Sequence, residues 1–133
     1  MDTNKLKKFA QFARRTLREQ VAAKLALVLS NGSAARRESA DAVGKLEDAV
    51  ASSSKEQVVE RVAYTWFNRF CALRFMDVNR YTRIGVVSPA EGQFQPEILL
   101  EAKMGHIGEE LASGPQRQKI SDLLSGKSPS SDA

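Results

Sequence analysis

The stretch of sequence that decides the fold is residues 55–78, KEQVVERVAYTWFNRFCALRFMDV. Projected at 100° per residue, its apolar side chains fill two opposite arcs of a helix. The first arc holds Val58, Val59, Val62, Ala63, Trp66, Phe70, Leu73 and Met76, and the second holds Tyr64, Phe67, Cys71 and Phe75. A helix that is apolar nearly all round buries more than one side. This stretch therefore predicts a long helix that needs packing partners on two faces.

The rest of the chain offers apolar bulk for one side of this helix and little for the other. The second side is expected to dock on a surface outside the chain, through a face made of Tyr64, Phe67, Arg74 and Phe75. Arg69 and Arg74 lie within or beside the apolar arcs, so each needs a carboxylate or carbonyl partner once it is desolvated. Such partners can also lie outside the chain.

Residues 5–29 predict a second long helix, with one apolar and one basic face. The apolar arc holds Leu6, Phe9, Ala10, Ala13, Leu17, Val21 and Val28, and the basic arc holds Lys7, Lys8, Arg14, Arg15 and Arg18. Thr3 or Asn4 can cap its start, and Gly32 can end it. Clustered cations on one helical face attract a polyanion without reading its sequence. The basic face is therefore a candidate contact to nucleic acid or to an acidic partner, with an ordinary solvated face as the alternative.

The other predicted elements are short. Helices are expected over residues 34–52, 97–104 and 115–125, and Ser53 or Ser54 has the spacing of a capping box for the long helix that follows. Residues 84–88, IGVVS, suggest a short edge strand ended by Pro89. The fold class is mainly α, a small helical domain over residues 1–125 with two long helices. Residues 126–133 are polar and are expected to be a disordered tail.

Composition restricts the chemistry that the chain can carry. The 133 residues hold 20 Lys and Arg against 16 Asp and Glu, with one cysteine and one histidine. A disulfide and a clustered Cys/His metal site are thereby excluded, and Cys71 is expected to be a buried thiol. No phosphate-binding loop, nucleophile elbow or His-Glu-x-x-His motif occurs, so no catalytic, cofactor-binding or metal residue is predicted. Without a signal sequence or a membrane-length apolar run, the chain is expected in the cytoplasm and away from membranes.

Three stretches carry a family resemblance: MDTNKLKKFAQFARRTL at residues 1–17, VAYTWFNRFCALRFMD at 62–77 and IGVVS at 84–88. Together they resemble the N-terminal region of the PglX-type adenine-specific DNA methyltransferases of bacterial BREX phage-defence systems. The resemblance implies a role in N6-adenine methylation of DNA with S-adenosylmethionine. In that family the cofactor-binding glycine motif and the Asn-Pro-Pro-Tyr-type catalytic motif lie further along. Neither occurs here, where the four prolines are never adjacent.

The leading hypothesis is thus a partial, N-terminal fragment of such a methyltransferase, inactive alone. Its expected partners are DNA, through the full-length protein, and the rest of the methyltransferase or other defence-system subunits. Two alternatives stay open. One is a free-standing helical module that binds nucleic acid or protein through the basic face of residues 5–29, and the other is a small protein that dimerises through the excess apolar face of residues 55–78.

Overall fold

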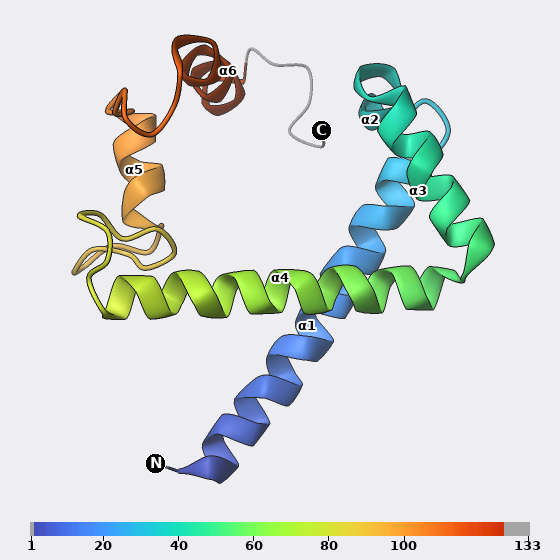
Figure 1. The fold of residues 1–133 in the computed structure, drawn as a ribbon, viewed down its shortest axis with the longest axis horizontal. Coiled ribbons are helices and arrows are strands. Elements are labelled where there is room, and N and C mark those ends of the chain that lie inside the picture. The colour runs from blue at the N-terminus through green and yellow to red at the C-terminus, as the bar shows by residue number, and fades with distance from the viewer. Residues whose placement is uncertain (1, 127–133) are drawn as a thin grey trace. The chain divides into compact units, whose positions relative to one another are not determined.

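The computed structural model describes residues 2–126 as six helices with no strand (Figure 1). The helices are α1 (Thr3–Leu29), α2 (Ala34–Glu38), α3 (Ala40–Ser52), α4 (Lys55–Val78), α5 (Glu97–Lys103) and α6 (Gly114–Leu124). The predicted mainly helical fold class is confirmed, with α1 and α4 as the two long helices. The tail expected at residues 126–133 lies outside the described residues from 127 onward.

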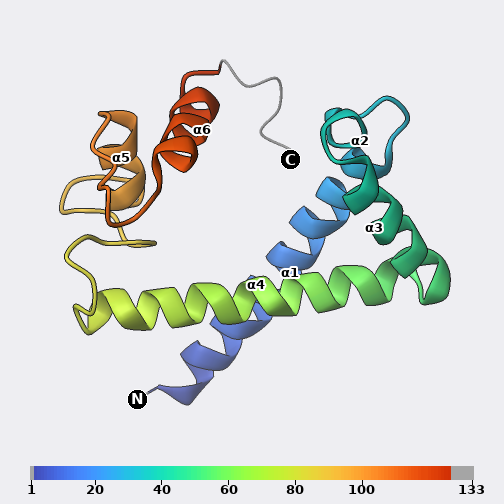
Figure 2. The same cartoon turned by 45° about the horizontal axis from the view of Figure 1, so that its top comes forward.

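The chain forms two compact units, and the division falls inside α4, between Arg69 and Phe70. The first unit holds α1, α2, α3 and the start of α4, and within it α2 and α3 lie together beyond the end of α1 (Figure 2). The second unit holds the end of α4, a long loop, and the contacting pair α5 and α6. Within residues 2–126, every helix is too short or too polar to cross a membrane.

The first helix begins earlier than predicted. Its cap is Asp2, whose carboxylate accepts hydrogen bonds from the backbone N–H groups of Asn4 at 3.0 Å and Lys5 at 3.2 Å. The prediction of Thr3 or Asn4 as the cap is therefore wrong, because an aspartate one residue earlier satisfies the same orphan donors with a charged acceptor. Gly32 follows the helix with φ of 69°, the left-handed conformation expected where a helix ends.

The single helix predicted over residues 34–52 is two helices, α2 and α3, separated at Ser39 with φ of −142°. The guanidinium of Arg36 accounts for this arrangement. It donates to the carbonyl of Leu29 at 2.7 Å and of Ser30 at 3.1 Å, and it pairs with Glu47 of α3. One side chain thus ties the end of α1 to both short helices, and the backbone turns at Ser39 to permit it.

The third predicted helix has the predicted bounds. Ser54 caps it, since its hydroxyl accepts from the backbone N–H of Gln57 at 3.2 Å, whereas the Ser53 hydroxyl donates backwards to the carbonyl of Ala49.

The core of the first unit is made of small and medium side chains from several helices. It consists of Leu25, Ala35, Val43, Val58, Val59 and Ala63. This core is thin, as the modest apolar bulk of the sequence predicts.

The edge strand predicted near residues 84–88 is absent from the described chain, and that prediction is wrong. The backbone N–H groups of Val86, Val87 and Ser88 donate to the Asp77 carboxylate and not to a neighbouring strand. The loop then meets the start of α5, where the N–H of Ile98 donates to the carbonyl of Gly85 at 3.0 Å. A side chain has taken the donors that a strand would need.

The last helices end and begin as the sequence indicates, within one residue. Pro96 precedes α5 as its N-cap residue. Ser113 precedes α6, and its backbone N–H donates to the side-chain oxygen of Gln116 at 2.8 Å. Gly126 follows α6 with φ of 72°. These are the expected uses of proline, serine and glycine at helix ends.

Candidate interaction surfaces

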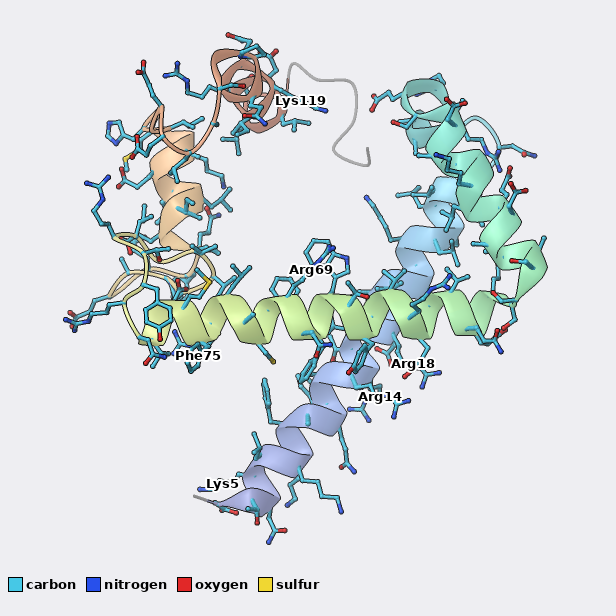
Figure 3. The ribbon with its side chains drawn as sticks, in the orientation of Figure 1. Lys5, Arg14, Arg18, Arg69, Phe75 and Lys119 are labelled. Carbon is cyan, nitrogen blue, oxygen red and sulfur yellow. The ribbon has the colours of Figure 1, made fainter. Side chains whose placement is uncertain are left out.

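The basic face of α1 is partly occupied by the chain itself. Arg14 donates to Glu60 Oε1 through Nε at 2.9 Å and through Nη2 at 2.6 Å, and Arg18 Nε lies 2.9 Å from Glu60 Oε2. One carboxylate of α4 thus holds both arginines where α1 passes α4 (Figure 3). These two predicted phosphate contacts are therefore part of the packing of the first unit.

The remaining three cations of this face are differently placed. Lys7, Lys8 and Arg15 are exposed, and none of the three forms an ion pair with another described residue. Arg15 lines an open groove between α1 and the start of α4, together with Glu19 and Glu56. The unpaired part of the basic face is therefore smaller than the sequence alone indicates.

A second groove of the first unit lies beside the Glu60 pairs. It has a volume of about 390 Å³ and is lined by Ala10, Arg14, Glu60, Ala63, Tyr64 and Phe67. Tyr64 is 67% exposed, while Phe67 is half-buried. Two of the predicted docking residues, Tyr64 and Phe67, thus share one accessible apolar groove.

Arg69 of α4 contacts an aromatic side chain of the same helix. The guanidinium of Arg69, which Figure 3 labels, lies 5.0 Å from the centroid of the Trp66 ring, and this is a cation–π contact. Trp66 remains 42% exposed. The sequence analysis predicted a carboxylate or carbonyl partner for Arg69. The partner in the structure is instead the aromatic ring of Trp66, within the chain.

The other two predicted docking residues belong to the second unit. Arg74 donates a hydrogen bond to the Ser88 hydroxyl, so its partner also lies within the chain. Phe75 packs edge-to-face on Tyr81, with ring centroids 5.9 Å apart, and it stays 59% exposed. The predicted docking face is thus divided over the two units.

Sequence reasoning missed the role of Asp77. Its carboxylate accepts three backbone hydrogen bonds, each of 2.9 Å, from Val86, Val87 and Ser88. The Val86 bond is the largest cause that lowers the pKa of Asp77 from 3.8 to about 2, and the other bonds add to it against the opposing effect of burial. A signal was present in the sequence. An acid in the last turn of a helix opposes the helix dipole and needs donors from elsewhere.

The cysteine and the histidine of the chain are both exposed. Cys71 is exposed, so the expectation of a buried thiol is wrong. His106 is exposed as well, with Nδ1 2.8 Å from Glu101 Oε2. Within residues 2–126, no three His, Cys, Asp or Glu side chains gather in a way that would hold a metal ion.

Comparison with known proteins places the chain near one group of enzymes. It is 49% identical over 53 residues to the adenine-specific methyltransferase PglX of Lacticaseibacillus casei (strain Zhang), a match covering 38% of the chain and 4% of PglX. It is 29% identical over 153 aligned positions to the adenine-specific methyltransferase BrxX of Escherichia coli O9:H4 (strain HS), covering 95% of the chain and 12% of BrxX. No protein-family model and no solved structure matches. The homology to PglX and BrxX is therefore weak, and the chain spans a small share of their length.

Proposed function

We propose that this chain is the N-terminal helical part of an adenine-N6-specific DNA methyltransferase of a BREX-like phage-defence system. The observation that carries the proposal is the similarity to PglX over 53 residues and to BrxX over 95% of the chain. Both relatives are named adenine-specific methyltransferases, and the chain spans 4% and 12% of their lengths. In this proposal the methyl transfer belongs to a longer protein, and the chain alone is inactive.

Exposed aromatic side chains on α4 support the idea of a docked remainder. Tyr64, Trp66 and Phe75 are 67%, 42% and 59% exposed. Large apolar side chains gathered on one helix are typical of surfaces that a partner covers. The partner proposed here is the rest of the methyltransferase, because most of the length of both relatives lies outside the matched region.

The substrate and cofactor follow from the proposed enzyme and not from this chain. The adenine that is methylated and S-adenosylmethionine would be bound by the remainder of the protein, in the cytoplasm. The described residues supply helices and a thin core, and the sequence holds no Asn-Pro-Pro-Tyr-type motif. The contribution of the chain in this proposal is therefore positional.

The test compares the chain alone with the chain joined to the coding sequence that follows its gene. Both proteins are incubated with duplex DNA and S-adenosylmethionine labelled in the methyl group, and N6-methyladenine is then measured in the DNA. The extended protein is expected to transfer methyl groups and the chain alone is not. A downstream sequence without an Asn-Pro-Pro-Tyr-type motif, or an extended protein that leaves adenine unmodified, would contradict the proposal.

A second candidate function is a free-standing module that binds nucleic acid through the basic face of α1. The observation that favours it is that Lys7, Lys8 and Arg15 are exposed and form no ion pair within residues 2–126. A module of this kind binds duplex DNA with an affinity that falls as salt rises, and Lys7→Gln with Lys8→Gln removes part of that dependence. An unchanged salt dependence in the double variant would exclude this use of the face.

A further inference from the structure

A polar groove in the second unit gathers three arginines. It has a volume of about 680 Å³ and lies between the end of α4, the turn after it, the loop of residues 84–89 and the start of α5. Arg74, Arg80 and Arg83 all line it. They lie within ten residues of one another in the sequence, so a single turn of the backbone brings them to one surface.

The two acids that line the same groove accept hydrogen bonds from backbone N–H groups. The Asp77 carboxylate accepts from the N–H groups of Val86, Val87 and Ser88, and Glu97 Oε2 accepts from the N–H of Gly85 at 3.0 Å. Within residues 70–126 neither acid forms an ion pair with an arginine of the groove. The two carboxylates hold the loop in place and leave the guanidinium groups available.

The three arginines are weakly engaged. Arg74 donates to the neutral hydroxyl of Ser88, and Arg83 pairs with Glu110 at 3.2 Å in a contact where both side chains are exposed. Such an exposed pair is readily exchanged for another anion, because solvent and salt screen it. Arg80 forms no ion pair with any described residue.

The backbone of Arg80 gives a reason to assign its side chain a role. Its φ is 55°, in the left-handed region, and it is the one residue other than glycine with positive φ in residues 2–126. It follows α4 in the position where the N–H of the next residue, Tyr81, donates back to the carbonyl of Met76 at 3.0 Å. Glycine is the residue that this position favours. An arginine at this position therefore adopts a backbone conformation that costs it free energy.

We propose that this groove, through Arg80 and Arg83 with Arg74 beside them, binds neighbouring phosphates of the duplex DNA backbone. The inference rests on the proposed function for the choice of DNA. The guanidinium group matches a phosphate in shape and charge, since its planar fork offers paired N–H donors. Contacts of this kind position a protein on a duplex without reading bases.

The test measures binding of the full chain to a fluorescein-labelled DNA duplex by fluorescence anisotropy, at salt concentrations between about 50 and 200 mM. Arg80→Gly and Arg83→Gln are each expected to reduce the slope of log affinity against log salt by about 0.9, the value of one lost phosphate contact. Arg80→Lys keeps the charge and is expected to keep most of the slope. Arg61→Gln, an exposed arginine of α4 outside the groove, is the matched control and leaves the slope unchanged.

Folding is separated from binding in this design. Because glycine suits the backbone of residue 80, Arg80→Gly is expected to melt at or above the temperature of the wild-type chain. Weaker binding by a variant that is at least as stable is then a loss of contact. Equal slopes for Arg80→Gly, Arg83→Gln and the wild-type chain would overturn the proposal.

Three further binding measurements identify what the groove recognises. Binding of inorganic phosphate to the chain is measured by calorimetry. Anisotropy measures the binding of a labelled duplex RNA to the chain, and the binding of the DNA duplex to the Lys7→Gln, Lys8→Gln double variant. Binding of phosphate without binding of the duplex, tighter binding of RNA, or complete loss of binding in the lysine variant would each contradict the inference. Its failure is distinct from failure of the proposed function, because methyl transfer by the extended protein is assayed separately from binding by the chain.

Discussion

The carboxylate of Asp77 accepts a hydrogen bond of 2.9 Å from the backbone N–H of Val86, nine residues further along the chain. Together with the bonds from Val87 and Ser88, it fastens the loop after α4 to the last turn of that helix. These donors are those that the predicted edge strand would have used. A single acid thus determines that residues 86–88 form a loop.

The first prediction concerns the pH dependence of this loop. Because the pKa of Asp77 is lowered from 3.8 to about 2, its charged form stabilises the folded loop. A group with a depressed pKa contributes fully above its unfolded value and loses that contribution as the pH falls towards its folded value. The amide resonances of residues 86–88 are therefore expected to keep their positions down to about pH 4 and to shift between about pH 4 and 2.

The substitution Asp77→Asn removes the same negative charge at neutral pH. An amide offers one oxygen in place of two charged ones, so the amides of residues 86–88 are expected to exchange faster with solvent. Asp41→Asn, at an exposed acid of α3, is the control and leaves those amides unchanged. Unaltered exchange in Asp77→Asn would mean that the loop is held by other contacts.

The second prediction concerns Glu60, which pairs with Arg14 and Arg18. Both arginines are substantially exposed, so Glu60→Gln is expected to lower the free energy of unfolding by only about 0.5–1 kcal/mol. The difference from the wild-type chain shrinks as salt rises, because salt screens the pairs. Urea titrations at low and high salt measure it, with Glu19→Gln on the exposed surface of α1 as the control. An effect independent of salt would argue against ion pairing.

The third prediction concerns the core of the first unit. Val58 is 2% exposed, and Val58→Ala is expected to lower the free energy of unfolding by about 2 kcal/mol, because two buried methyl groups are lost and a cavity is left. Val78→Ala, at a position 63% exposed near the end of the same helix, is expected to change it by less than about 0.5 kcal/mol. Thermal melts of both variants check the contrast, and equal effects would place the core elsewhere.

The fourth prediction tests the docking face. Tyr64 is 67% exposed in this chain, so Tyr64→Ala is expected to alter the free energy of unfolding of the chain alone by no more than about 0.5 kcal/mol. In the extended protein the same substitution removes a covered aromatic side chain and is expected to cost about 2–4 kcal/mol. Asn68→Ala, at an exposed polar position of α4, is the control. Equal effects in the two proteins would mean that Tyr64 is not covered.

The helical fold could be predicted because its signals are periodic and local. Residues 55–78 place their apolar groups on two arcs of a helical projection, and the ends of α4 lie where predicted. The boundary at Ser39 could not be found in this way. It depends on Arg36, whose guanidinium reaches both Leu29 and Glu47, and such a contact joins segments that a local pattern treats separately.

The candidate surfaces could be predicted in part. The positions of the cations on α1 were evident from spacing, but their pairing was not, because Glu60 lies on another helix far along the chain. The exposure of Tyr64 and Phe75 was expected from the shortage of apolar bulk. The arginine groove was not expected, since it depends on the loop that Asp77 holds and on the left-handed backbone of Arg80.

The exposed thiol of Cys71 is a single site for covalent labelling of the protein. It lies two residues after Arg69, beside the division between the two compact units, and the sequence contains no other cysteine. A maleimide dye or nitroxide attached there reports on the junction without any engineered cysteine and without competing attachment points. In storage the same group can couple two molecules through oxidation, so preparations of this protein require a reductant.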